Sequence, residues 1–370
     1  MRPRLEFHWC VPVVGDGFYL GLPNWERPPT LEYAVEIAQT AERHGFQHLL
    51  YGMGFNNHTL EAWTLATSVL ALTERAGAMV AVRPGFFSAP ILAKMATTLD
   101  HVCGGRLALN VVTGGRPDEQ AMYGDRLDHD ARYRRTSEFL EITRKLWTTT
   151  QPFDYQGEFH HLEHSRLEML PLQPGGPRIY FGGASEAATQ VGASHAHVYL
   201  MWGEPLDLIA QRISSMRALV EARGRTNELR YGLRINVVAR RTDEEARDAA
   251  REMISKVPEE LLEKGRRTEF PNTRRQSVGQ GRQWELRGKA DADWYLSPGL
   301  WAGISIVRSG AGMALVGSYE RVAEMVLEYA DLGISSFILS GYPHLEECNN
   351  VGRNVLPLVR EGYLRRQSKR

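Results

Sequence analysis

Two arginines stand within apolar runs of the sequence, where a positive charge needs a partner. Arg234 lies in the run GLRINVV, and Arg308 lies in the run ISIVRSG. A buried charge without a partner is strongly unfavourable, so each guanidinium requires either a carboxylate of the chain or an anionic ligand. Two such arginines at one site favour the ligand, because the guanidinium fork donates paired hydrogen bonds to oxyanions.

A pair of glycines marks a second candidate site for an anion. Gly182 and Gly183 end an apolar run, and Ser185 stands where a helix is expected to begin. The segment is either a tight turn with a serine N-cap or a cradle for a phosphate, which the free N–H groups and the helix dipole would favour. Asn110, inside another apolar run, needs hydrogen-bond partners from neighbouring backbone or from a ligand.

Further polar and aromatic side chains follow other apolar runs. Tyr342 and His344 flank a proline after the run ISSFILSG, and they belong either to a plain loop or to the rim of an active site. In the segment LDHDARY, His129 and Tyr133 are four residues apart, so they share a face if the segment is helical. The remaining candidates at the ends of runs are Asn56, Asn57, His58, Thr113, Trp202 and Asn236.

The elements that must position these residues alternate between strand and helix. Helical patterns separate most of the strand-like runs; LEYAVEIAQTAERHG, for example, places its apolar residues on one face. Eight buried parallel strands with helices between them predict an α/β fold, a (β/α)8 TIM-like barrel. An open doubly wound sheet is the alternative, but no Gly-x-Gly-x-x-Gly follows the first run. The expected strands cover residues 5–13, 47–52, 76–83, 106–113, 178–183, 197–203, 231–240 and 335–341.

Two segments interrupt this alternation, and we expect them to be insertions in a single domain spanning residues 1–370. Residues 149–177 are polar, aromatic and rich in turn residues, which predicts a hairpin-like excursion. Residues 257–299 are rich in Arg, Gln and Gly and only weakly periodic. A loop of that length in a compact domain is typical of a mobile lid or a binding segment.

Composition narrows the class of protein. Lys and Arg total 44 and so do Asp and Glu, so no net charge favours nucleic acid or an anionic membrane. No apolar stretch is long enough to span a bilayer, and three widely spaced cysteines suit free thiols in a reducing cytoplasm. The runs FHHLEH and DHD lack the spacing of zinc ligands, so we expect no metal.

Taken together, these motifs resemble the bacterial-luciferase-like flavin monooxygenases, and within them the FMNH2-dependent alkanesulfonate monooxygenases. The resemblance rests on TLDHVCGGRLALNVVTG, LDHDARY, YFGGAS, YLMWGEP, LSPGLWAG, VRSGAGMALVG and SGYPHLEE. It implies a TIM-like barrel that takes reduced FMN from a separate NAD(P)H-dependent flavin reductase, uses O2, and releases sulfite from a C–S bond. We also expect a homodimer or homotetramer.

The resemblance assigns roles position by position. It implies that flavin and its phosphate are held by Asn110, Thr113, His129, Tyr133, Gly182, Gly183 and Ser185. It implies that the catalytic pocket is formed by Trp202, Arg234, Arg308, Tyr342 and His344.

Three positions depart from the alkanesulfonate pattern, which leaves the acid or base of the reaction open. Val14 and Asn236 replace histidines, and the loop after the second strand, where the alkanesulfonate enzymes usually carry a cysteine, is two residues longer and reads GMGFNNHTLEAW, with Asn57 in it. Amide and imidazole groups at Asn56, Asn57, His58 and Asn236 would bind substrate hydroxyls. We therefore expect a hydroxylated sulfonate such as sulfoquinovose, or else an alkanesulfonate. The alternatives are a luciferase-like monooxygenase of a sulfone or chelator, and a flavin- or deazaflavin-dependent dehydrogenase.

Overall fold

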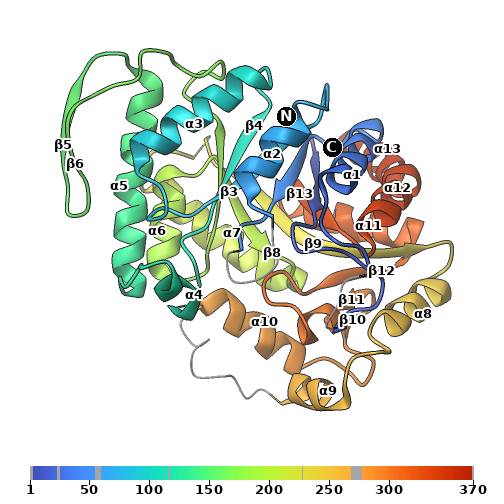
Figure 1. The fold of residues 1–370 in the computed structure, drawn as a ribbon. Helices are drawn as coiled ribbons and strands as arrows, with labels where there is room; N and C mark the ends of the chain where they lie inside the picture. Colours follow the sequence, from blue (N-terminus) through green and yellow to red (C-terminus); the bar gives the residue numbers. More distant parts are fainter. Residues whose placement is uncertain are drawn as a thin grey trace.

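The centre of the molecule is a closed parallel barrel (Figure 1). The computed structural model describes residues 3–22, 26–54, 60–115, 117–226, 228–267 and 277–368. Each barrel strand pairs in parallel with its neighbours, and the last strand returns to the first. The eight strands expected from the sequence are all present, so the (β/α)8 prediction is confirmed. They are β1 (Glu6–Val11), β2 (His48–Tyr51), β3 (Gly77–Val82), β4 (Leu107–Val111), β7 (Arg178–Gly182), β8 (Val198–Trp202), β9 (Arg230–Arg240) and β13 (Ile334–Ser340).

Helices surround the barrel, and their starts are set by side chains that satisfy free N–H groups (Figure 1). Thr30, Ser88, Asp128 and Ser185 each cap the helix that follows them. The longer helices are α1 (Leu31–Arg43), α2 (Ala62–Leu70), α3 (Ala89–Val102), α5 (His129–Thr148), α6 (Glu186–His195), α7 (Leu206–Glu221), α8 (Asp243–Met253), α10 (Val278–Gly288), α11 (Tyr319–Asp331), α12 (His344–Asn354) and α13 (Leu356–Ser368). Shorter ones are α4 (Pro117–Met122), α9 (Glu259–Arg266) and the 3-10 turn η2 (Gly303–Ile306).

The barrel interior is filled in layers, because successive strand residues alternate between inside and outside. Its apolar middle is a cluster separate from the core under the helices, and it includes Cys10, Leu50, Met79, Val198 and Ile338. Polar side chains lie on either side of this apolar cluster, here called the apolar plug, toward the amino ends and the carboxyl ends of the strands. A ligand site is expected at the end where these polar side chains have no hydrogen-bond or ion-pair partner in the protein.

The two interrupting segments carry structure of their own. Within residues 149–177, β5 (Phe153–Gln156) and β6 (His161–Ser165) pair antiparallel. Within residues 257–299, α9 and α10 precede β10 (Tyr295–Ser297). β11 (Leu300–Trp301) and β12 (Ala314–Ser318) extend the sheet, with β12 pairing along the second half of the long β9. Residues 268–276, inside the predicted lid, lie outside the described residues.

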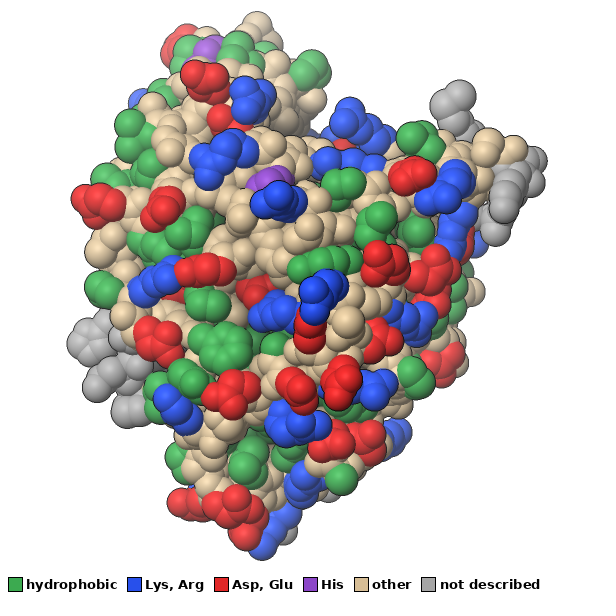
Figure 2. All heavy atoms as spheres, turned by 90° about the vertical axis from the view of Figure 1, so that its right-hand side faces the viewer, with side chains coloured by type: hydrophobic (Ala, Val, Ile, Leu, Met, Phe, Trp, Pro, Cys, Tyr) green, Lys and Arg blue, Asp and Glu red, His purple; other side chains and the backbone are tan. Residues whose placement is uncertain are grey.

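Surface charge and helix composition bear on whether the molecule binds nucleic acid or a membrane. On the face shown in Figure 2, basic and acidic side chains are interspersed rather than gathered by sign, in keeping with equal totals of 44. None of the helices in the described ranges combines the length and apolar character that crossing a membrane requires.

Candidate active site

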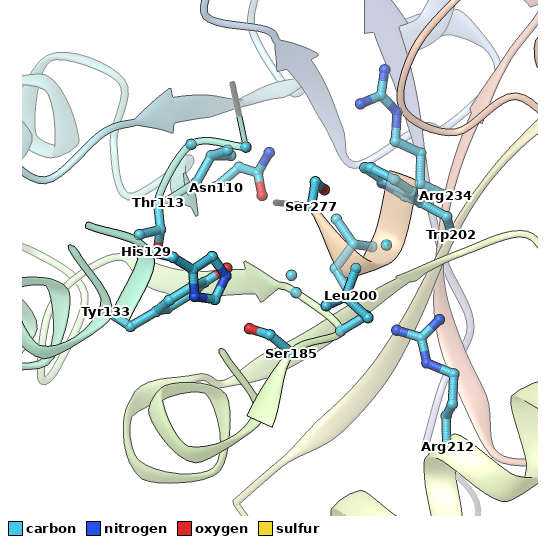
Figure 3. A pocket seen from close by; sticks show the side chains of 18 of the residues that line it. Asn110, Thr113, His129, Tyr133, Ser185, Leu200, Trp202, Arg212, Arg234 and Ser277 are labelled. Atoms are coloured by element: carbon cyan, nitrogen blue, oxygen red, sulfur yellow. The ribbon is translucent and has the colours of Figure 1, made fainter. Parts of the chain in front are cut away.

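A cavity of about 210 Å³ opens where the barrel strands end. Carboxyl ends of parallel barrel strands meet at one rim, so residues far apart in sequence converge there. Figure 3 shows the predicted flavin-binding residues along one side of the cavity, with Trp202 and Arg234 on the other. The predicted residues that line it are Asn110, Thr113, His129, Tyr133, Gly182, Gly183, Ser185, Trp202 and Arg234.

The glycine segment after β7 forms a cradle at the start of α6. Ser185 Oγ accepts a hydrogen bond from the N–H of Ala188 at 3.2 Å, so Ser185 is the N-cap. Tyr133 also hydrogen-bonds Ser185, although burial dominates and raises the pKa of the phenol. A Cβ on Gly183 would collide with Ala188 Cβ, so only glycine fits beside the helix start. The cradle thus combines close backbone, a helix N-terminus and hydroxyl groups, as an anion site requires.

Two further predicted residues lie beside this cradle. The His129 ring lies 4.9 Å from the Tyr133 ring, as the four-residue spacing predicts for a helix. Its Nδ1 also pairs with Asp130 Oδ1 at 2.6 Å. Thr113 Oγ1 contacts Thr136 Oγ1 at 3.4 Å, which joins the loop after β4 to α5.

Asn110 is a largely buried side chain whose amide opens on the cavity. Its residue is 7 % exposed and it lines the cavity. Within the described ranges, no donor or acceptor bonds its amide. An amide that opens on a cavity without a protein partner is available to bond a ligand or water. The sequence left open that neighbouring backbone groups bond the Asn110 amide. In the described residues they do not.

Arg234 supplies the unpaired positive charge of the cavity. It pairs in register with Trp202 across β8 and β9, and both side chains line the wall. Among the residues that the structure describes, no carboxylate forms an ion pair with Arg234, and its buried Nε has no acceptor. By contrast, the neighbouring Arg212 is neutralised by Glu204, whose Oε1 lies 2.9 Å from its guanidinium.

Arg308, Tyr342 and His344 pack against one another and are not among the residues that line the cavity. The Arg308 guanidinium lies over the Tyr342 ring, 4.4 Å from its centroid. Burial raises the pKa of Tyr342, and the charges of Arg308 and Arg234 oppose that rise. The His344 ring packs edge-on against Tyr342 at 4.8 Å.

His344 is itself occupied by a buried carboxylate. Its backbone N–H and its Nδ1 contact the two oxygens of Asp16 at 2.6 and 2.9 Å, and Tyr33 donates to the same carboxylate at 2.6 Å. Burial disfavours the ionised Asp16, but His344 and Tyr33 outweigh it and lower its pKa. The structure therefore brings His344 to Tyr342 and not to the cavity.

The structure does not bring the predicted substrate-binding residue Asn236 to the cavity. Asn236 is buried, its Nδ2 donates to the carbonyls of Ala311 and Met313, and its Oδ1 accepts from Ser340. These bonds use the groups that were expected to bind substrate hydroxyls, and Asn236 is not among the residues that line the cavity. The other members, Asn56, Asn57 and His58, lie outside the described residues.

Other lining residues were not anticipated from the sequence. Ser277, Val278 and Gly279 begin α10 and close one side of the cavity, and Glu204 and Arg212 line another part. The start of α10 lies inside residues 257–299, which the sequence predicted to be a lid. The signal that could have located this helix start is its N-cap serine, Ser277. In the described ranges, no group of three His, Cys, Asp or Glu side chains is placed to hold a metal.

Comparison with known proteins agrees with this geometry. The family model described as luciferase-like monooxygenase matches residues 5–336. EDTA monooxygenase (EmoA) from Chelativorans sp. BNC1 superposes with a TM-score of 0.78 at 18 % identity, covering 97 % of this chain and 94 % of that one. DmoA from Hyphomicrobium sulfonivorans gives 0.78 at 20 % identity, with 98 % and 89 % covered. The riboflavin lyase RcaE, solved with modified FMN and riboflavin, gives 0.78 at 20 %, with 98 % and 92 % covered. At these identities the likeness shows the fold.

Proposed function

The chain belongs to the luciferase-like monooxygenase family, and from this premise we propose that it is an FMNH2- and O2-dependent monooxygenase that cleaves the C–S bond of an organosulfonate. The balanced reaction is R–CH2–SO3⁻ + FMNH2 + O2 → R–CHO + HSO3⁻ + FMN + H2O. The substrate is a hydroxylated sulfonate such as sulfoquinovose, or an alkanesulfonate. A separate NAD(P)H-dependent reductase supplies the reduced flavin.

The residues present fit a flavin. The unsatisfied amide of Asn110 offers a donor and an acceptor to the polar edge of a ring system. The cradle at Gly183 and Ser185 offers a helix N-terminus to a phosphate. When bound, reduced flavin supplies the electrons that activate O2. The chain would hold the ring at Asn110 and the phosphate at Ser185.

The observation that carries the anionic substrate is the Arg234 guanidinium. It lines the cavity, and no carboxylate in the described chain pairs with it. Arg234 is partly buried and its Nε has no acceptor, so a ligand that fills the cavity would remove the remaining water from the guanidinium, and an anionic group would offset that cost. A sulfonate presents three oxygens to the planar donor fork, which suits Arg better than Lys.

The remaining predicted residues act around this anchor. Trp202 forms an apolar wall that limits water near the reacting carbon. Arg308 and Tyr342 would add donors next to Arg234, and the pair of His344 with Asp16 would fix the Tyr342 ring. Residues 257–299 would close over the occupied site. Helix α10 of this segment already packs against the rest of the protein, because its Trp284 is only 5 % exposed.

The test is sulfite release with reduced FMN across alkanesulfonates and sulfosugars. We expect oxygen-dependent sulfite from at least one of them. Oxygen-dependent products from sulfones or chelators, without sulfite from any sulfonate, would replace the proposed substrate class with the first alternative. Turnover of an alcohol with a deazaflavin and no oxygen would make the protein a dehydrogenase.

A further inference from the structure

Two helices, not one, begin at the cavity. Ser185 caps α6, and Ser277 caps α10 by accepting a hydrogen bond from the N–H of Gln280 at 3.3 Å. The first N–H groups of a helix have no acceptor inside it. At α10 these belong to Val278 and Gly279, and both residues line the cavity.

The two helix starts lie next to each other. A Cβ built on Gly279 would stand 3.8 Å from Ala184 Cβ, immediately before the α6 cap, and 3.5 Å from the Trp202 ring. A Cβ on Gly115 would stand 3.2 Å from Ser277 Oγ, so the loop after β4 also reaches this place. The positive ends of two helix dipoles therefore converge at one position.

An independent side chain indicates that the cavity next to these helix starts takes a ligand. Asn110 is 7 % exposed, and among the described residues nothing bonds its amide. Figure 3 shows that amide pointing into the cavity, on the side where Ser277 stands. This amide suits the polar edge of the flavin ring, and the phosphate of the same ligand would then reach the two free helix ends.

The start of α10 is held in place by contacts made beyond the cavity. Gln280 Oε1 accepts from the N–H of Gly310 at 2.7 Å. Gln283 donates to the carbonyl of Gly203 at 3.0 Å and accepts from Gly312 at 3.4 Å. The helix end is thus fixed before any ligand arrives, which lowers the cost of binding.

We propose that the N-terminal turn of α10, Ser277 to Gly279, is the second arm of the phosphate site, so that the phosphate of FMN is held between α6 and α10. This inference rests on the proposed flavin chemistry. A phosphate carrying nearly two negative charges gains from both helix ends, whereas riboflavin, which lacks the phosphate, gains from neither. Discrimination of FMN from riboflavin then depends on α10 as well as on Ser185.

The experiment compares Ser277→Asp with Ser277→Asn in anaerobic titrations of reduced FMN and reduced riboflavin. Asp and Asn have the same shape and both cap helices well, so only the charge differs. We expect Ser277→Asp to weaken FMN binding by about tenfold or more, because its carboxylate repels the phosphate. Ser277→Asn should keep FMN affinity, and both variants should keep riboflavin affinity, within about threefold.

A second variant guards against a defect in folding. A Cβ at Gly279 makes ordinary contacts, so Gly279→Ala should melt like the wild type, while its methyl group, in the cavity and 3.8 Å from Ala184 Cβ, would crowd a phosphate held between the two helix starts and weaken FMN alone. Unchanged FMN affinity in Ser277→Asp, or equal loss of both flavins, would overturn the inference. Wild-type protein that binds neither flavin would overturn it together with the flavin chemistry. If FMN is discriminated through Ser277 but no sulfite forms, the phosphate site stands and the proposed substrate falls.

Discussion

The two ends of the barrel bury polar groups in opposite ways. At the amino ends of the strands, Glu6 pairs with Arg178 and Arg230, each at 2.8 Å. Close by, His8 bonds Ser336 at 2.9 Å. At the carboxyl ends, Asn110 and Arg234 face a cavity without partners from the described chain.

The contrast is sharpest where one strand serves both ends. Arg230 and Arg234 lie on the same face of β9, four residues apart, and one is paired while the other is not. A partly buried charge therefore does not by itself mark a functional site. What marks it is the absence of a partner combined with an opening to a cavity, because the fold then leaves a cost that a ligand can offset.

The largest expected effect comes from Arg234→Lys. The charge stays, but the donor fork is lost, so kcat/KM for sulfite release should fall about ten- to a thousandfold, or roughly 1.4–4 kcal/mol. The measurement is steady-state sulfite production beside a thermal melt. Full activity would place the anion elsewhere in the cavity.

Arg230→Lys is the matched control for that change. It lies on the same strand but serves the closed end, where it pairs with Glu6 and Ser335. We expect a lower melting temperature with kcat/KM within about threefold of the wild type. If the two variants lose activity equally, the distinction between the ends is wrong.

The next prediction concerns pH and the closed end. Burial lowers the pKa of His48 to about 4. The unfolded chain, with a pKa near 6.5, binds the proton first, so stability falls as pH drops from about 6.5 to 4. The loss is on the order of 3 kcal/mol for this group. Urea unfolding between about pH 7 and 4.5 checks it. A flat curve would show that His48 protonates freely in the fold.

Glu6→Gln should have a smaller effect on the same end. It leaves Arg178 and Arg230 without their carboxylate, and partial exposure softens the penalty. We expect about 1–3 kcal/mol of destabilisation. Flavin affinity should not change, and flavin titration of the variant measures this. A loss of flavin binding would mean that the ends are coupled through the apolar plug.

The smallest effect is expected at the open end, from Ser185→Ala. The hydroxyl caps α6 and meets Tyr133, so its loss should weaken reduced FMN binding by roughly 1 kcal/mol. Reduced riboflavin serves as the comparison. Equal affinities for FMN before and after the change would leave Ser185 as an N-cap alone.

The barrel itself was predictable because each strand is a local apolar run. The sequence did not reveal β12, since β9 is long enough to pair with β8 first and with β12 later. It also did not reveal α10 as a packed helix. Gly279, Gly281 and Gly288 weaken its helical pattern, and contacts of Gln280 and Gln283 with distant backbone hold it.

The sequence predicted that the site residues lie at strand ends. It did not predict which of them have hydrogen-bond or ion-pair partners in the protein. In the sequence, Asn110 cannot be told from Asn236, nor Arg234 from Arg230, because all four are polar residues within predicted strands. Only tertiary contacts separate them, such as the carbonyl of Met313 that Asn236 binds. The pairing of His344 with Asp16 joins residues 328 positions apart, and no local pattern encodes it.

The most direct measurement follows oxygen and sulfite together in one reaction with reduced FMN, the protein and an organosulfonate. Reduced FMN consumes one O2 when it reoxidises without substrate and then yields hydrogen peroxide, so an organosulfonate should divert oxygen from peroxide to sulfite, at up to one sulfite for each O2 consumed. Arg234→Lys should lower the sulfite yield and raise the peroxide yield. Oxygen uptake with no sulfite above the control lacking protein, for every sulfonate, would contradict the proposal.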